Sequence, residues 1–218
     1  MKLQKLTLAL AIAGVSAIAT AAYADDTHSS GFFAGVGGGY NHMTLPSGNL
    51  TFVDDTGATN TVTISSKKYM FDIYGGYLFD MGSGFDIGPV LNFSYYGPYK
   101  LLDNTTGASE NVHIYNINLE AVGQYTWQSF FARVNAGEGY FMLRGSASGS
   151  DTHNQSDNDN EWKPLAGFTA GYYFTPAISA GLYYQHVFGS TLSDDNPMPK
   201  MDSVGINVEY AFGGMSGS

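Results

Sequence analysis

Regular alternation of apolar and polar side chains is the feature of this sequence that most constrains its fold. Because successive side chains of a β-strand point to opposite faces, alternation predicts strands that bury or expose one apolar face. The pattern recurs eight times. The expected strands are Gly31–His42, Lys67–Phe79, Phe85–Tyr96, Val112–Trp127, Phe130–Leu143, Pro164–Phe174, Ile178–Val187 and Asp202–Phe212.

The connections between these segments alternate in length, which indicates that the strands run antiparallel. The three tight turns are Asp80–Gly84, Gln128–Ser129 and Thr175–Ala177. The four long, polar connections are Met43–Ser66, Gly97–Asn111, Arg144–Lys163 and Phe188–Met201. Within the first of them, Leu50–Asp54 and Thr61–Ser65 also alternate, so we expect an additional hairpin beyond the main sheet. An even number of amphipathic strands with short turns on one side and long loops on the other is typical of outer-membrane barrels.

The positions of the aromatic residues separate a membrane barrel from a soluble one. A soluble, lipocalin-like barrel would direct its apolar faces inward. Here the apolar faces end in two aromatic rows, as expected where a barrel meets both surfaces of a bilayer. The row near the turns comprises Phe79, Phe85, Tyr125, Trp127, Phe130, Phe174 and Phe212, and the row near the loops comprises Tyr40, Tyr69, Tyr95, Tyr115, Tyr140 and Tyr184. We therefore predict an all-β fold: an eight-stranded antiparallel transmembrane β-barrel with short periplasmic turns and long extracellular loops.

The glycine-rich start of the first strand, "GFFAGVGGGY", does not match a dinucleotide-binding loop. Gly35 and Gly37 begin the G-x-G-x-x-G spacing, but Tyr40 occupies its last position. As part of a strand, the glycines lie on the inward face of a barrel whose interior is only wide enough for side chains. We expect them to make room for the inward side chains Arg133, Met70, Tyr74 and Phe131.

The first residues have the pattern of a secretion signal. Lys2 and Lys5 precede the apolar run Leu6–Ala19, and Ala22–Ala24 has small residues suited to cleavage. A retained membrane anchor is the alternative. We expect a signal peptide over residues 1–24 and a barrel domain over residues 25–218. Without the two lysines the chain has 7 basic and 19 acidic residues, a net charge of −12, which disfavours nucleic acid as a partner.

Three segments resemble the OmpA-like, opacity-type family of small outer-membrane barrels. They are "GFFAGVGGGY", the hairpin "AGFTAGYYFTPAISAGLYYQHVFG" and the last strand "VGINVEYAF". The resemblance implies a location in the bacterial outer membrane, contact with outer-membrane lipids and lipopolysaccharide, and insertion by the barrel-assembly machinery. It also implies that Tyr210 and Phe212 form the assembly signal, although residues 213–218 follow where the family often ends. We expect no periplasmic peptidoglycan-binding domain and no cell-wall tethering.

Several charged residues fall on inward faces, where an unpaired charge would be costly. These residues are Lys68, Asp72, Asp86, Glu120, Arg133 and Glu209. The family resemblance implies a lumenal charge network, which we assign to Asp72, Glu120, Arg133 and Glu209. Arg133 is the one basic residue expected well inside the barrel, in contact with Glu120, Asp72 or Glu209. Glu138 falls on the apolar face, and a bulge at Gly137–Gly139 would redirect it.

Two other patterns suggest reactive sites. His186, Ser190 and Asp194 or Asp195 could form a hydrolytic triad near the outer rim, as in lipid A deacylases, although those enzymes have a tighter His-x-Ser spacing. The acidic segment Asp151–Glu161 fails as an EF-hand, because Trp162 and Phe168 occupy positions that require glycine and glutamate. The sequence has no cysteine, which excludes disulfides and thiolate sites. We therefore expect no catalytic residues, no metal and no cofactor.

These features predict a non-enzymatic barrel that acts in envelope integrity, adhesion or host contact through its extracellular loops. Its further partners would then be host or environmental surface ligands. One alternative is a narrow pore or a carrier of small hydrophobic molecules. A third, weaker alternative is a lipid A-modifying enzyme.

Overall fold

The computed structural model describes residues 30–44, 49–53, 59–64, 67–103, 109–148, 158–189 and 200–212. These residues form ten strands. They are β1 (Gly31–Thr44), β2 (Asn49–Val53), β3 (Thr59–Ile64), β4 (Lys67–Asp80), β5 (Phe85–Asp103), β6 (Ser109–Trp127), β7 (Phe130–Ser148), β8 (Asn158–Tyr173), β9 (Ile178–Val187) and β10 (Lys200–Phe212). No helix among the described residues is long and apolar enough to span a membrane. The expected signal peptide, residues 1–24, lies outside the described residues.

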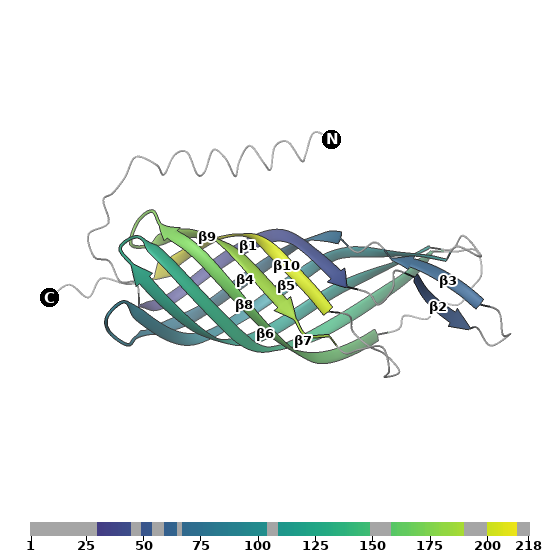
Figure 1. Ribbon diagram of the computed structural model, residues 1–218, viewed down its shortest axis with the longest axis horizontal. Coiled ribbons are helices and arrows are strands. Elements are labelled where there is room, and N and C mark those ends of the chain that lie inside the picture. Colours follow the sequence, from purple (N-terminus) through teal and green to yellow (C-terminus); the bar gives the residue numbers. More distant parts are fainter. Residues whose placement is uncertain are drawn as a thin grey trace, which may run out of the picture.

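Eight of the strands close into an antiparallel barrel. The sheet order is β2-β3-β5-β4-β1-β10-β9-β8-β7-β6, and the additional β5–β6 pairing joins the sheet to itself. Strands β2 and β3 form the expected extra hairpin, which is attached to the barrel wall through the β3–β5 pairing. The predicted eight-stranded barrel is thus confirmed (Figure 1). We call the end with the connections at residues 81–84, 128–129 and 174–177 the turn end, and the opposite end the loop end.

Exposure follows the predicted alternation, with apolar side chains outside and polar ones inside. On β6, Leu119 is 63% exposed whereas its neighbour Asn118 is fully buried. On β7, the exposed Phe130 and the partly exposed Tyr140 mark the two aromatic rows. Ten residues of a strand tilted by about 40° rise about 25 Å, which matches the apolar band of outer-membrane barrels. The outward assignment of the apolar faces is therefore confirmed.

The strands between β5 and β8 are longer than the sequence indicated. The segments 97–103 and 109–111 were expected in a loop but belong to β5 and β6, and 144–148 and 158–163 belong to β7 and β8. The prediction stopped at Tyr96 because Gly97 and Pro98 interrupt the alternation. A register shift between Tyr96 and Tyr99 absorbs the interruption, so that both tyrosines are buried in the lumen. The expectation that 144–163 is one long connection was therefore wrong for its two ends.

The expected bulge at Gly137–Gly139 is absent. Pairing runs without a shift through this segment, with Glu138 opposite Leu119 on β6 and Pro164 on β8. Glu138 consequently lies exposed on the outer face, two residues from Tyr140. A carboxylate beside the aromatic row can extend toward the polar edge of a bilayer, which explains why the strand need not bend.

Two inward glycines of β1 allow close approach of side chains from β4. A Cβ atom at Gly35 would overlap the Tyr74 ring, and one at Gly37 would overlap the Asp72 carboxylate. The expected role of these glycines as space for lumenal side chains therefore applies to Tyr74. Phe131 is instead accommodated by Gly171 of β8.

Candidate functional site

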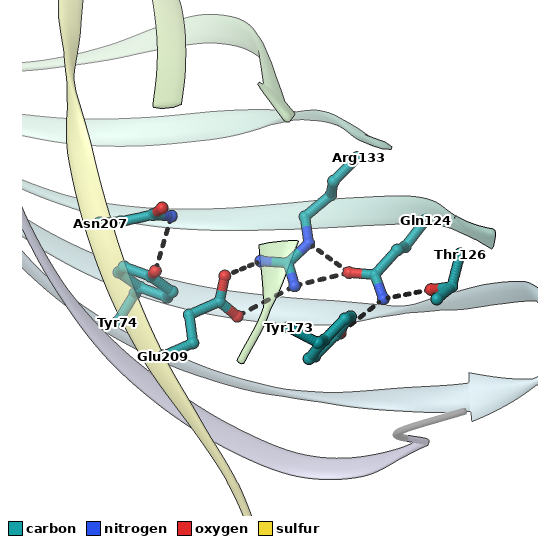
Figure 2. A network of polar contacts seen from close by, with 7 residues as sticks. All are labelled: Tyr74, Gln124, Thr126, Arg133, Tyr173, Asn207 and Glu209. Atoms are coloured by element: carbon teal, nitrogen blue, oxygen red, sulfur yellow. Dashed lines mark hydrogen bonds and ion pairs between the residues drawn. The ribbon is translucent and has the colours of Figure 1, made fainter. Parts of the chain in front are cut away.

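The lumen is the part of the molecule where charged groups converge, and Arg133 of β7 is at its centre (Figure 2). Its Nη1 and Nη2 atoms donate to Glu209 Oε1 and Oε2 of β10, both at 2.9 Å. Its Nε and Nη2 atoms also donate to Gln124 Oε1 at 3.0 and 2.7 Å. The guanidinium lies 4.9 Å from the Phe33 ring centroid and 5.4 Å from that of Phe131. Arg133 is thus fully engaged by one carboxylate, one amide and two aromatic faces.

Neutral groups extend this contact on both sides (Figure 2). Gln124 Nε2 donates to Tyr173 Oη at 3.0 Å and to Thr126 Oγ1 at 3.2 Å. Near Glu209, Asn207 Nδ2 donates to Tyr74 Oη at 2.8 Å. These bonds join β6 to β8 and β10 to β4, and the Arg133–Glu209 contact joins β7 to β10 across the lumen.

The other two predicted members of the network do not contact Arg133. Asp72 Oδ1 accepts a hydrogen bond of 2.9 Å from Tyr183 Oη. Glu120 accepts bonds from Asn135 Nδ2 and, at 3.4 Å, from Gln185 Nε2. The structure therefore joins Arg133 to Glu209 and leaves Asp72 and Glu120 with neutral donors.

A cavity of about 60 Å³ lies between Arg133 and the two carboxylates of Asp72 and Glu120. Asp72, Glu120 and Arg133 are its charged lining residues, and Asn92, Asn135 and Asn207 contribute amides. Both carboxylates are about 95% buried, so they lie on the inner side of the barrel wall, and we call this cavity the chamber.

Apolar side chains pack toward the loop end of the lumen. This cluster, which we call the upper plug, consists of Met43, Met70, Tyr96, Tyr99, Ile114, Phe141, Leu165, Val187 and Met201. Its tyrosines are anchored by amides, because Asn116 Nδ2 donates to Tyr96 Oη and Tyr99 donates to Asn41. Toward the turn end, a second cluster contains Phe33, Tyr74, Leu78, Val90 and Val122. Packed side chains therefore occupy the lumen on both sides of the chamber.

Arg133 is not the only basic side chain inside the barrel. Lys163 of β8 is 8% exposed and pairs with Glu161. Sequence reasoning missed it because residue 163 was assigned to a loop. The alternation Lys163, Leu165, Gly167 was the signal that could have found it, since it continues the inward face of β8.

Of the residues considered for a hydrolytic triad, His186 is the one that lies within the described part of the chain. His186 lies on the outer face of β9, and its Nδ1 is 2.8 Å from Asp202 Oδ1 on β10. Tyr184 Oη donates to the same oxygen at 2.5 Å, and the Phe188 ring packs edge-on against the imidazole. Ser190, Asp194 and Asp195 lie outside the described residues. The acid next to His186 is thus Asp202, which the β9–β10 register places directly opposite it.

The remaining site predictions concern metals and assembly. Within the described ranges, no three His, Asp or Glu side chains are grouped closely enough to hold a metal ion. Of the acidic segment Asp151–Glu161, the first seven residues lie outside the described part and the rest are in β8. Tyr210 and Phe212 are exposed on the outer face of β10, with ring centroids 4.9 Å apart.

Comparisons with known proteins identify the fold of this chain through solved structures that share little sequence with it. No protein-family model matches the chain, and a search of curated proteins finds no match. Among solved structures, OprG from Pseudomonas aeruginosa is 10% identical, with a TM-score of 0.51 over 85% of this chain and 98% of OprG. Neisserial surface protein A is 15% identical, with a TM-score of 0.49 over 84% and 98%.

A third similar structure is Ail, the attachment invasion locus protein of Yersinia pestis, in complex with the heparin analogue sucrose octasulfate. It is 13% identical, with a TM-score of 0.47 over 84% of this chain and 99% of Ail. OprG is an outer membrane protein, and the likeness to it shows a shared fold. The fold of this chain is that of the small eight-stranded bacterial outer-membrane β-barrels.

Proposed function

We propose that the protein is a non-conducting barrel of the bacterial outer membrane that contacts other surfaces through a sheet raised above the bilayer. The barrel-assembly machinery would insert it, and lipopolysaccharide would surround it. The observation that carries the proposal is the unequal height of the barrel wall at the loop end. The lumen, by contrast, is occupied by packed side chains.

The height difference follows from the strand bounds. Strand β7 continues to Ser148, eight residues past Tyr140 of the aromatic row, whereas β9 ends at Val187, three residues past Tyr184. Eight residues of a tilted strand rise about 20 Å above the row, and three rise about 8 Å. Strands β5 and β6 accompany β7, and the β2–β3 hairpin continues the same wall through its pairing with β5 (Figure 1).

The raised wall ends in strand β2, whose outer edge pairs with no other described strand. Edge strands are usually protected by charged residues or proline, because their free N–H and C=O groups can pair with another chain. The residues of β2 (Asn49–Val53) and β3 (Thr59–Ile64) include neither. An unprotected edge above the bilayer supports a role in which an extended segment of a surface partner adds to the sheet.

The test compares cells that display the full-length protein with cells that display two variants. Thr51→Pro removes a backbone N–H from β2, and replacement of residues 49–64 by a short Gly-Ser segment removes the hairpin. We expect the full-length protein to increase adhesion to cultured epithelial cells or matrix-coated plates. Both variants should insert normally and lose that increase. Retention of adhesion by the hairpin-deleted protein, at equal surface amounts, would contradict the proposal.

A narrow pore is the competing function, and the packing of the lumen disfavours it. The upper plug buries Tyr96, Phe141 and Met201 completely. Arg133 and Glu209 bridge the lumen beneath it. Passage of ions would require both layers to move apart, so a measurement of conductance in planar bilayers tests the pore alternative.

A further inference from the structure

Two buried carboxylates in the lumenal chamber have no charged partner among the described residues. Asp72 is 4% exposed and Glu120 is 5% exposed, and both line the chamber of about 60 Å³. Within the described part of the chain, neither forms an ion pair with lysine or arginine. Arg133 lines the same chamber, but its charge is balanced by Glu209. Burial of uncompensated charge is strongly unfavourable, so the chamber requires a further positive charge or two protons.

The hydrogen bonds around Glu120 favour its ionised form. Both of its oxygens accept, Oε1 from Gln185 Nε2 and Oε2 from Asn135 Nδ2. A protonated carboxyl group would use one oxygen as a donor, whereas a carboxylate only accepts. Asp72 accepts from the Tyr183 hydroxyl through its Oδ1 atom. Because Tyr183 and Gln185 are both inward residues of β9, they bring Asp72 and Glu120 to the same region of the chamber.

A third oxygen points to a ligand independently of the acids. Asn207 is 5% exposed and lines the chamber. Its Nδ2 donates to Tyr74, but its Oδ1 atom is buried and has no hydrogen-bond partner among the described residues. A buried amide oxygen without a donor is unfavourable and can be satisfied by a cation. Asn92 and Thr169 contribute further oxygens to the lining.

We propose that the chamber binds one hard cation, of the calcium class, between Asp72 and Glu120, with Asn207 Oδ1 as a further oxygen donor. Carboxylate and amide oxygens are the ligands that such ions prefer. A divalent ion would balance the two uncompensated carboxylates. The chamber volume accommodates an ion with a few water molecules. Because packed side chains lie on both sides, the ion enters as the barrel folds and exchanges slowly afterwards.

This site was not visible in the sequence because its oxygens come from three strands that are distant in the chain. Asp72 is on β4, Glu120 on β6 and Asn207 on β10. The inference does not depend on the proposed surface function, since the chamber lies within the bilayer-spanning part of the barrel.

The test is a measurement of retained metal. The protein is refolded from urea into detergent micelles with calcium or with EDTA, desalted into EDTA and assayed for calcium by mass spectrometry. We expect calcium-refolded protein to retain about one ion per barrel. The doubly substituted Asp72→Asn, Glu120→Gln protein should lose it. Glu138→Gln, which alters a carboxylate on the outer face, is the matched control and should retain the ion.

Two results would overturn the proposal. One is equal retention by the double variant and the wild type, which would place the ion on another part of the molecule. The other is the absence of retained metal after refolding with calcium. Should the double variant fail to fold, terbium luminescence sensitised by Tyr183 and Tyr74 applies the test to wild-type protein. Terbium emission that EDTA removes at once indicates a surface site and also refutes a cation site in the chamber.

Discussion

Replacing Glu209 by glutamine isolates the energetic role of the Arg133 contact. In the native barrel two hydrogen bonds of 2.9 Å join the guanidinium to Glu209, and both side chains are nearly buried. Glu209→Gln removes the negative charge, leaving Arg133 with Gln124 as its other acceptor. Removal of one member of a buried ion pair costs about 3–5 kcal/mol. Because glutamine retains one acceptor oxygen, we expect the lower end of that range, about 3 kcal/mol.

The measurement is urea unfolding in lipid vesicles, followed by the fluorescence of Trp127 and Trp162. Both tryptophans are 62% exposed on the outer face, so their emission should change when the barrel leaves the lipid. A second variant, Arg133→Met with Glu209→Gln, removes both charges of this pair and should recover at least half of the lost free energy of unfolding. If the free energy of unfolding of Glu209→Gln lies within about 1 kcal/mol of the wild-type value, water already solvates the guanidinium, and the lumen is wetter than its packing indicates.

Two further outcomes are expected. Leu119→Arg places a charge on the lipid-facing side of β6 and should lower the free energy of unfolding by about 2–4 kcal/mol. Asn118→Ser, on the lumenal face, should have a smaller effect. Equal effects of the two substitutions in the urea assay would contradict the assignment of faces. In planar bilayers the folded wild-type protein should show no stable, porin-sized conductance, and truncation of the upper plug by Tyr96→Ala with Phe141→Ala should increase ion flux. Large, stable currents from the wild-type monomer would show that the lumen is open.

The barrel was predictable because its signal is local. Each pair of neighbouring residues on a strand reports which side faces lipid, as Asn118 and Leu119 do. The signal weakens above the aromatic rows, where both faces of a strand meet water and polar residues are acceptable on either side. For this reason alternation alone does not reveal the extension of β7 to Ser148. Pairing in the raised wall depends on neighbouring strands, which sequence alternation does not describe.

The lumenal contacts were predictable only as a set of candidates. Sequence alternation placed Arg133 inside and allowed three acidic partners, but it contains no information on distances across the barrel. Arg133 is on β7 and Glu209 on β10, so two strands separate them around the wall. Their contact depends on the stagger of strands around the closed barrel, which sets the height of each side chain in the lumen. The same stagger brings Asp72 of β4 to Tyr183 of β9.

Polar groups that face the lumen and polar groups in the raised wall above the bilayer find their hydrogen-bond partners in different ways. Inside the barrel, eight strands leave so little space that a polar atom must find a partner on a facing strand, and a mismatch such as Asn207 Oδ1 is costly. Above the bilayer, water can satisfy any exposed backbone group, so the free edge of β2 can persist without cost until another strand pairs with it. A change inside the lumen should therefore alter stability with little effect on binding. Alteration of β2 should change binding with little effect on stability, so the two classes of variant can be separated in one set of unfolding and adhesion measurements.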